Sequence, residues 1–307
     1  MTNTETLKEI QEILNSEFIN SETGEVLTGK ELGELTQLEK GIKRTNQLNK
    51  YHNKTALQEL IFNEYGTFFF TNYKEVLNSF VTDKGSFDSA LAFRFIYLST
   101  FMDYDNNLMF GLPFRGKDRG RMNIKDLREV MGLSRNQITK FRKALTDLDL
   151  LFIDSEGNLS INKRCCKKGN LKKSTRRDFI RCFEEGVQEI YQNSTAKEHK
   201  RLGYFIQLLP YVNYNHSILC WNPEEIEANK IQPLTIQDIC KILNISVSHA
   251  RRTERDLYKI TINGQHLLGK FIYYSAEVFI INPAVYYKGN DLTALKGIMN
   301  LFNMVNK

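Results

Sequence analysis

One pattern occurs twice in this chain, first as FIYLSTFMDYDNNLMF at residues 95–110 and again as FIQLLPYVNYNHSILC at residues 205–220. The next block, MNIKDLREVMGLS, is matched by LTIQDICKILNIS at an offset of 112. The closing block, INKRCCKKGN at residues 161–170, is matched by INPAVYYKGN at residues 281–290. Three blocks in the same order, whose offset drifts from 110 to 120, predict an internal duplication of a unit of roughly 90 residues.

Each copy predicts a winged helix, in which a helix-turn-helix is followed by β-strands. In the first copy we expect helices at Ser89–Phe101, Ile124–Met131 and Arg135–Leu148, with Gly132 at the turn and Ser134 as N-cap, and then the strands LLFID and NLSIN. In the second copy we expect helices at His199–Leu209 and Thr235–Leu243, a turn at Asn244-Ile245, an N-cap at Ser246, a helix to Leu257, and strands that turn at Asn263-Gly264 and Ser275-Ala276.

The predicted fold class is mostly α with small β-hairpins (α+β), built as two tandem winged-helix domains after an N-terminal α/β segment. In that segment we expect helices at Thr6–Leu14 and Lys30–Asn49, a hairpin in FINSETGEVL, and a buried strand in GTFFFTNY between two short helices, packed against the first repeat. The predicted domains are an N-terminal segment (1–84), winged helix 1 (85–173), a linking helix (174–195, its helical stretch at Thr175–Gln192), winged helix 2 (196–290) and a C-terminal amphipathic helix (291–307).

Composition places the chain among intracellular proteins. Its 307 residues are 41% hydrophobic, which is enough for two or three cores. There is no run of 18 apolar residues, and the N-terminus MTNTETLKEI is polar, so we expect a cytoplasmic protein without a membrane partner. The five cysteines show no C-x-x-C spacing and are interpreted as packing residues in a reducing compartment, with no metal and no cofactor.

Positive charge is concentrated in the first repeat. The net charge is +6, yet residues 115–177 alone hold 18 Lys and Arg against 7 Asp and Glu, whereas residues 196–290 hold 11 against 8. Such segregation is typical of a face that binds a polyanion, although a charge run can also be a solvated surface. The charge distribution therefore favours a nucleic acid as partner.

The third helix of each repeat is the candidate reader of DNA. Its apolar stripe in repeat one, Ile138, Phe141, Leu145 and Leu148, fixes a polar opposite face by the 3.6-residue period. Amide side chains suit adenine edges, and Lys or Arg suits guanine or phosphate. The base-reading candidates are Asn136, Gln137, Thr139, Lys140 and Lys143 in repeat one, and Ser248, His249, Arg251, Arg252 and Arg255 in repeat two.

Basic segments on both sides of the first helix-turn-helix are candidates for contact with backbone phosphates. The residues are Arg115, Lys117, Arg119 and Arg121 before it, and Lys163, Arg164, Lys167, Lys168, Lys172, Lys173, Arg176 and Arg177 after its wing. The alternative is a solubilising linker. The wing tip, Asp154-Ser155-Glu156, is acidic, which argues against its entry into a minor groove.

Enzyme motifs are incomplete in this sequence. Residues 111–117 resemble a phosphate-binding loop, but Asp118 stands where a Mg²⁺-binding Ser or Thr is required. The set His249, Arg252 and Tyr258 is reminiscent of tyrosine recombinases, but it is confined to one helix of the repeat. No paired metal-binding histidines, clustered carboxylates or G-x-S-x-G motif occur, so we expect no catalytic residues and no enzyme activity.

The repeated unit resembles the winged-helix units of replication and regulatory proteins from plasmids and phages of low-GC Gram-positive bacteria. The resemblance is carried by the FIYLSTFMDYDNN and FIQLLPYVNYNHS helices, LREVMGLSRNQITKFRKAL, and INPAVYYKGN, and covers residues 85–290. Two winged helices in about 300 residues also resemble the plan of iteron-binding plasmid replication initiators. No individual functional residue is carried over from these families.

The expected function is sequence-specific binding of double-stranded DNA by two winged helices, in a plasmid or phage replication initiator. The alternatives are a phage transcriptional regulator that controls lysis or lysogeny, and an interaction module in which winged helix 2 binds a partner protein. A homodimer and a replication or transcription partner are both compatible with the sequence. The target sequence, any effector and the role of residues 1–84 are left open by it.

Overall fold

The computed structural model describes residues 17–19, 26–28, 42, 56–110, 120–169, 171, 178–273 and 276–305. The chain forms two compact units, residues 1–58 and 59–307. In the first unit, β1 (Glu17–Ile19) and β2 (Val26–Thr28) pair as the predicted antiparallel hairpin. The expected helix at Thr6–Leu14 lies outside the described residues, and within Lys30–Asn49 only residue 42 is described, which is helical.

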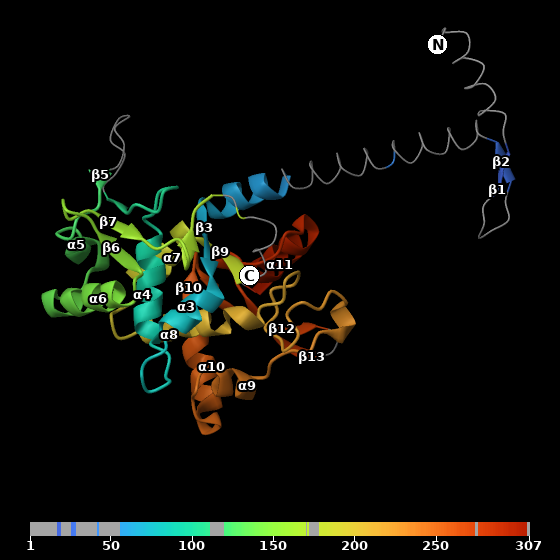
Figure 1. The fold of residues 1–307 in the computed structure, drawn as a ribbon. Coiled ribbons are helices and arrows are strands. Elements are labelled where there is room, and N and C mark those ends of the chain that lie inside the picture. Colours follow the sequence, from blue (N-terminus) through green and yellow to red (C-terminus); the bar gives the residue numbers. More distant parts are fainter. Residues whose placement is uncertain are drawn as a thin grey trace, which may run out of the picture. The chain divides into compact units, whose positions relative to one another are not determined.

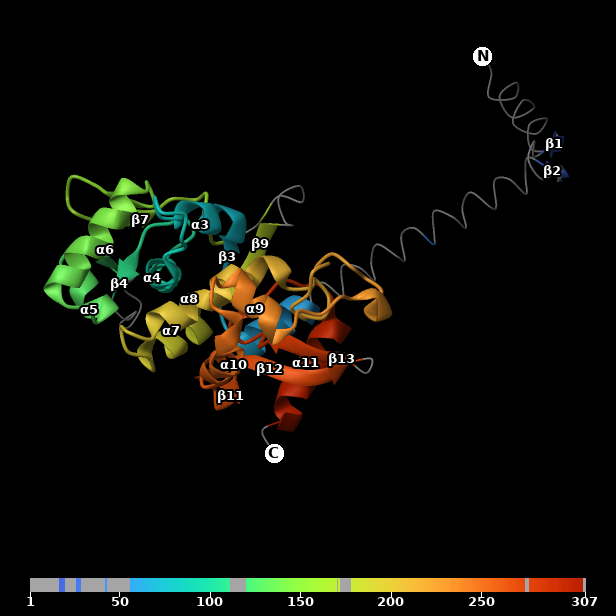
Figure 2. The same ribbon diagram turned by 90° about the horizontal axis from the view of Figure 1, so that it is seen from below.

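The second unit contains two halves with a similar order of helices and strands, and its α-helices with small antiparallel sheets confirm the α+β expectation (Figures 1 and 2). The first half, residues 66–169, contains β3 (Phe68–Asn72), α3 (Tyr73–Ser79), α4 (Ser89–Ser99), β4 (Met109–Phe110), β5 (Gly120–Arg121), α5 (Leu127–Met131), α6 (Arg135–Asp147), β6 (Leu151–Ile153), β7 (Leu159–Ile161) and β8 (Cys166–Lys167). Helical residues 56–65 precede it.

The second half, residues 178–305, has a similar order, but its described residues hold no strand pair in the place of β4–β5, and it contains additional elements. It contains β9 (Phe179–Phe183), α7 (Glu184–Gln192), α8 (His199–Leu208), the 3₁₀ turns η2 (Leu209–Tyr211) and η3 (Ala228–Lys230), α9 (Ile236–Ile242), η4 (Val247–His249), α10 (Ala250–Tyr258), β10 (Thr261–Ile262), β11 (Gln265–His266), β12 (Leu268–Tyr273), β13 (Ala276–Ile281), β14 (Tyr286–Tyr287) and α11 (Leu292–Val305).

A four-stranded antiparallel sheet joins the two halves in the order β14-β9-β3-β8. The opening strands of the halves, β3 and β9, pair at its centre, with Phe70 opposite Arg181. The closing strands lie outside them, so that Thr71 faces Cys166 on one side and Cys182 faces Tyr286 on the other. The predicted strand in GTFFFTNY is thus confirmed as β3, but it packs against both halves rather than against the first alone.

Part of the predicted linking helix is wrong. Residues 179–183 form the strand β9, and only Glu184–Gln192 are helical. The apolar residues of this stretch fit a helical face, but Ile180 and Cys182 alternate with half-buried neighbours as in a strand. Neighbouring strands on both sides of β9 provide partners for its backbone, which is a tertiary effect that a sequence window does not contain.

Two helix starts also differ from the prediction. Residues 124–126 form a turn before α5, in which the Asp126 carboxylate accepts a hydrogen bond from the Asn123 amide at 2.7 Å. After Ser246 the chain makes the 3₁₀ turn η4 before α10 begins at Ala250. The strands of the first wing, β6 and β7, and the turn at Asn263-Gly264 are confirmed, whereas Ser275 lies outside the described residues.

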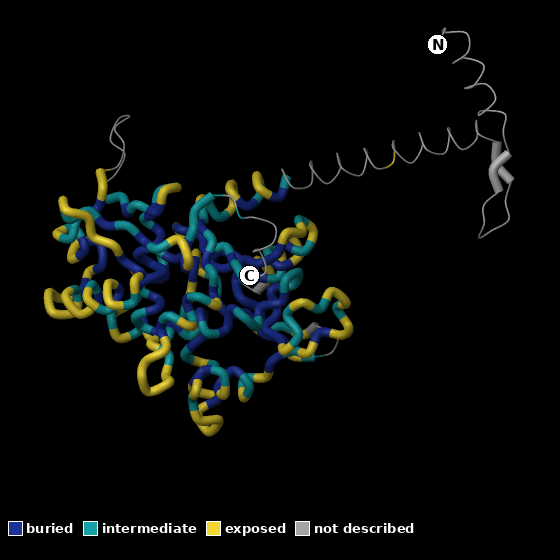
Figure 3. Tube along the Cα trace, viewed as in Figure 1, coloured by how far each residue is buried: buried dark blue, intermediate teal, exposed yellow. Residues whose placement is uncertain are grey.

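The core of the second unit centres on α4, which packs lengthwise on α8. Phe93, Phe95 and Ile96 on α4 are fully buried, and so is Phe205 on α8 (Figure 3). The backbones approach so closely that a Cβ atom on Gly203 would overlap the carbonyl oxygen of Ser89. The spatial relation of the two halves therefore depends on this helix pair as well as on the sheet.

The C-terminal helix docks on the second half through its apolar face, as its amphipathic pattern predicts. Leu295, Ile298 and Phe302 of α11 are buried. The ring of Phe302 lies edge-on to that of Phe271 on β12, with centroids 5.5 Å apart. This helix therefore covers one face of the β12–β13 hairpin.

A buried histidine lies where the two halves meet. The side chain of His199 on α8 is 2% exposed, and its ring centroid lies 4.3 Å from that of Tyr191 on α7. Arg94 on α4 donates from Nε to Nδ1 of His199 at 3.0 Å. Burial, together with the Arg94 charge, lowers the pKa of His199 from 6.5 to about 4. The imidazole is therefore neutral at neutral pH.

Acid should destabilise the fold through this group. Because the folded pKa is below the unfolded one, the contribution of His199 is complete above pH 6.5 and is lost as the pH falls toward 4. Between pH 7 and 5 we expect a loss of about 2 kcal/mol in the free energy of unfolding. Urea titrations at both pH values should show a smaller loss in His199→Gln, which keeps an acceptor for Arg94 but does not titrate. An equal pH dependence in both proteins would contradict this assignment.

Candidate nucleic-acid interface

Local capping signals position α6 as the sequence predicts. Gly132 adopts φ 57° at the turn after α5 and so closes that helix with a left-handed residue. Ser134 is the N-cap of α6, where its Oγ accepts from the Gln137 amide at 3.4 Å and Gln137 Oε1 accepts from the Ser134 amide at 3.0 Å. This capping box fixes the first turn of α6, and with it the direction of the helix.

The outer face of α6 is polar and cationic. Phe141 and Leu145 are buried on the inner face, so the opposite face lies in solvent (Figure 3). All five base-reading candidates in this helix are exposed: Asn136, Gln137, Thr139, Lys140 and Lys143. Gln137 takes part in the capping box, and the hydroxyl of Thr139 donates to the Arg135 carbonyl at 3.0 Å. Asn136, Lys140 and Lys143 are therefore the members best placed to contact a ligand.

The corresponding face of the second half is more strongly cationic but includes acids. Ser248 and His249 lie on η4, Arg251, Arg252 and Arg255 lie on α10, and all five are exposed. Asp256 of α10 forms ion pairs with Arg252 at 3.8 Å and with Arg201 of α8 at 3.4 Å. Part of the positive charge of α10 is thus compensated within the protein.

A hollow of about 220 Å³ between α8 and α10 brings in two residues that sequence reasoning missed. Arg201 and Tyr204 of α8 line it together with His249 and Arg252 from the predicted set. The sequence around Arg201, HKRL, is basic, but only the packing of α8 against α10 places this charge beside the reading helix.

Most of the predicted phosphate contacts cannot be placed. Arg115, Lys117, Arg119, Lys172, Lys173, Arg176 and Arg177 lie outside the described residues. Lys163 and Arg164 are exposed, and Arg164 donates to the Leu148 carbonyl at the end of α6 at 2.8 Å. Arg121 pairs with Asp154 at 3.1 Å and donates to Asn107 at 3.0 Å. Arg121 and Arg164 therefore also brace the wing and the helix end.

Lys168 does not fit the predicted contact with phosphate, because its charge is neutralised inside the protein. Its ammonium lies 2.6 Å from the Glu184 carboxylate at the start of α7, with both side chains largely buried. It also donates to the Met102 carbonyl at 3.2 Å. Lys167, on β8, is half-buried at the edge of the central sheet. Lys168 forms one of the contacts between the two halves, so we remove it from the phosphate set.

The acidic tip of the first wing is a tightly hydrogen-bonded turn. The Asp154 carboxylate accepts from the amides of Asn158 at 2.8 Å and Glu156 at 2.9 Å. These hydrogen bonds, with the neighbouring Arg121, hold the pKa of Asp154 below its usual value. The lowered pKa favours the negatively charged form of Asp154, which repels phosphate, so the expectation that this turn stays out of a minor groove is kept.

The cysteine thiols that could serve as metal ligands or nucleophiles are buried, and the loop that resembles a phosphate-binding loop lies outside the described residues. All five cysteines are free and buried, and burial raises the thiol pKa of Cys165, Cys166, Cys182 and Cys220. Among the described residues, no group of three or more His, Cys, Asp or Glu side chains is arranged to hold a metal ion. Burial also raises the pKa of Tyr258 to about 12, which disfavours it as a nucleophile. The loop at 111–117 that resembles a phosphate-binding loop is not described.

No helix of the described part of the chain combines the length and the apolar character needed to span a bilayer. Comparisons with known proteins found no matching family model, no matching curated protein and no matching solved structure.

Proposed function

We propose that this chain is a non-enzymatic, sequence-specific DNA-binding protein of the cytoplasm, and that its two halves are winged helices that arose by duplication. The order of strand, helix, helix, helix-turn-helix, hairpin and closing strand occurs in both halves. On this proposal, the four domains predicted after residue 84 (winged helix 1, the linking helix, winged helix 2 and the C-terminal helix) are parts of one compact unit, which consists of two halves.

The register of the central sheet supports the duplication. An offset of 111 relates β3 to β9, and the offset of 120 from the sequence blocks relates β8 to β14. With these offsets Phe70 corresponds to Arg181, which is also its pairing partner, and the pair Thr71–Cys166 corresponds to Cys182–Tyr286. An approximate two-fold relation between the halves would produce such a register. A chain with two readers so related suits two inverted half-sites.

The outer face of α6 is the observation that carries the proposal. Residues 135–146 contain four Lys or Arg and no acid, and their polar face projects into solvent from a capped, packed helix. α6 lies on one side of the α4–α8 pair and α10 on the other, in both views of the molecule (Figures 1 and 2). Helices so exposed can enter separate major-groove segments.

Replication initiation at a plasmid or phage origin is the process we propose, by resemblance to initiators of that plan. Control of phage transcription is the second candidate. A third, protein binding by the second half, is favoured by one observation: Arg252 of α10 is paired with Asp256, so that part of the positive charge of this helix is neutralised within the protein. A homodimer or a replication or transcription protein would then be the partner.

Selection of fragments from sheared DNA of the source replicon and its host, by the purified chain at about 150 mM salt, tests the proposal. We expect one short region to be enriched, with repeated or inverted elements inside the footprint. A region at an origin supports initiation, and one at a promoter supports transcriptional control. If no fragment is enriched over random-sequence duplex, sequence-specific DNA binding is wrong.

A further inference from the structure

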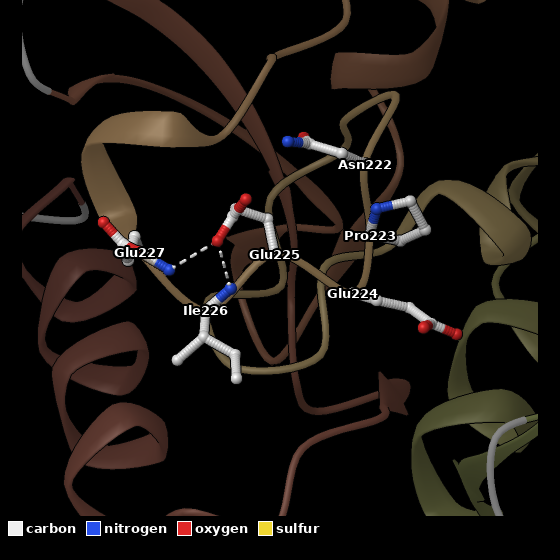
Figure 4. A pocket seen from close by; sticks show the side chains of 6 residues that line it. All are labelled: Asn222, Pro223, Glu224, Glu225, Ile226 and Glu227. Atoms are coloured by element: carbon white, nitrogen blue, oxygen red, sulfur yellow. Dashed lines mark hydrogen bonds between the residues drawn. The ribbon is translucent and has the colours of Figure 1, made fainter.

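The loop of residues 221–230, here called the acidic loop, is a rigid surface feature of the second half (Figure 4). Asn213 Nδ2 donates to the Glu225 carbonyl at 2.9 Å, and Asn222 Nδ2 donates to the Lys230 carbonyl at 2.9 Å. The Glu225 carboxylate turns back to accept from the amides of Ile226 at 2.8 Å and Glu227 at 2.9 Å. The conformation of the loop is therefore fixed before any partner arrives.

This rigid loop exposes apolar side chains. Ile226 is 75% exposed, more than any other large hydrophobic residue in the described part of the chain. Trp221 is 49% exposed and packs edge-on against Tyr211, with ring centroids 5.6 Å apart. An open hollow of about 770 Å³ lies over residues 222–227. A pre-organised apolar anchor beside a hollow is the kind of feature that other proteins bind.

The charge around the anchor selects the partner. Glu224 and Glu227 extend to opposite sides of Ile226 (Figure 4), and the only base of the loop, Lys230, pairs with Glu227 at 2.8 Å. Carboxylates at this place repel DNA phosphates. A cationic protein segment that carries an apolar residue fits the loop instead.

The same chain contains such a segment at the corresponding position of the first half. The duplication aligns Phe110 with Cys220 and Met122 with Leu234, so residues 111–121 correspond to residues 221–233. Residues 111–121 carry four Lys or Arg, one Asp and Phe114, whereas residues 221–233 carry three Glu and one Lys. The two copies of one loop have thus acquired opposite charge.

We propose that the acidic loop binds the basic segment 111–121 of a second copy of this chain. The segment begins directly after β4, and β4 and the acidic loop lie at opposite ends of the 59–307 unit in both views (Figures 1 and 2), which favours a contact between chains over one within a chain. Because the two surfaces differ, the contact is heterologous and joins copies head to tail. A small, charged interface of this kind is weak and salt-sensitive, with a Kd on the order of 10–100 µM.

Sedimentation velocity of the full chain, freed of nucleic acid, tests this proposal without DNA. At about 50 mM NaCl the weight-average sedimentation coefficient should rise between about 5 and 100 µM protein, and at about 500 mM NaCl it should stay constant. A coefficient independent of concentration at low salt would overturn the proposal. The result does not depend on whether the chain binds DNA, so either proposal can fail without the other.

Charge exchange provides the decisive variants. Glu224→Lys/Glu227→Lys and Arg115→Glu/Arg119→Glu should each abolish association, and an equimolar mixture of the two should restore it, because each variant then meets a complementary loop. Ile226→Ser, which leaves the charge unchanged, should weaken association at least 5-fold and tests the anchor should the first variant fold poorly. The control Glu59→Lys/Glu64→Lys makes the same change of net charge at exposed residues and should associate as the parent chain does. Association that persists in both loop variants, or no recovery on mixing, would contradict the contact.

Discussion

Replacing Lys140 and Lys143 of α6 by glutamate should weaken binding to the selected DNA fragment by about 30- to 1,000-fold at about 100 mM salt. Both ammonium groups lie on the exposed face of a helix whose inner face is buried, so the substitutions leave the packing of α6 intact. The loss corresponds to about 2–4 kcal/mol, as expected when two base or phosphate contacts are removed and replaced by repulsion.

Fluorescence anisotropy over a range of salt concentrations measures this effect. The slope of log K against log salt should fall in magnitude by about one for each phosphate contact that is lost. The control Lys84→Glu/Lys296→Glu makes the same change of net charge at exposed positions outside α6 and should change affinity less than 3-fold. Equal losses in the two double variants would mean that net charge, rather than the α6 face, determines binding.

The matching variant of the second half, Arg252→Glu/Arg255→Glu, separates the competing interpretations of that half. A loss similar to that of the α6 variant would identify α10 as a second reader. If affinity changes little, the second half serves protein contacts, and the first half is the main DNA anchor. Both outcomes leave the test of α6 unaffected.

Local signals explain why α6 was predictable. Ser134, Gln137 and Gly132 act within one turn of the helix ends that they define, and the apolar spacing in α6 needs only the helical period. The same helical period predicts which base-reading candidates of α6 and α10 are exposed. In α6, where the structure agrees with the sequence, the controlling interactions are local.

Long-range pairing explains what the sequence did not show. Residues 179–183 become a strand because β3, more than 100 residues earlier, pairs with them. Lys168 resembles its neighbours in a basic run, but Glu184 is brought beside it only by the joining of the two halves. The contribution of Arg201 to the second reading helix has the same origin, since α8 and α10 are distant in sequence.

The close contact of α4 with α8 leads to the largest expected effect on stability. Gly203→Ala should lower the free energy of unfolding by about 3 kcal/mol or more, because the new methyl group would overlap the backbone carbonyl of Ser89, which cannot move aside as a side chain could. Gly297→Ala on α11 is the matched control. A methyl group there meets no atom within 4 Å, so the better helix propensity of alanine should raise stability by about 0.5–1 kcal/mol.

A loss of stability in Gly203→Ala together with a gain in Gly297→Ala would show that the close approach of the two backbones, rather than glycine replacement in general, destabilises the fold. Urea titrations of both variants at neutral pH measure the difference, and a loss below about 1 kcal/mol in Gly203→Ala would mean that α4 and α8 are not in backbone contact. Because this helix pair lies between α6 and α10, loosening it should also disturb the relation of the two reading helices. On the proposed function, a variant such as Gly203→Ala that still folds would therefore lose affinity for the complete site while each half keeps its affinity for a single half-site.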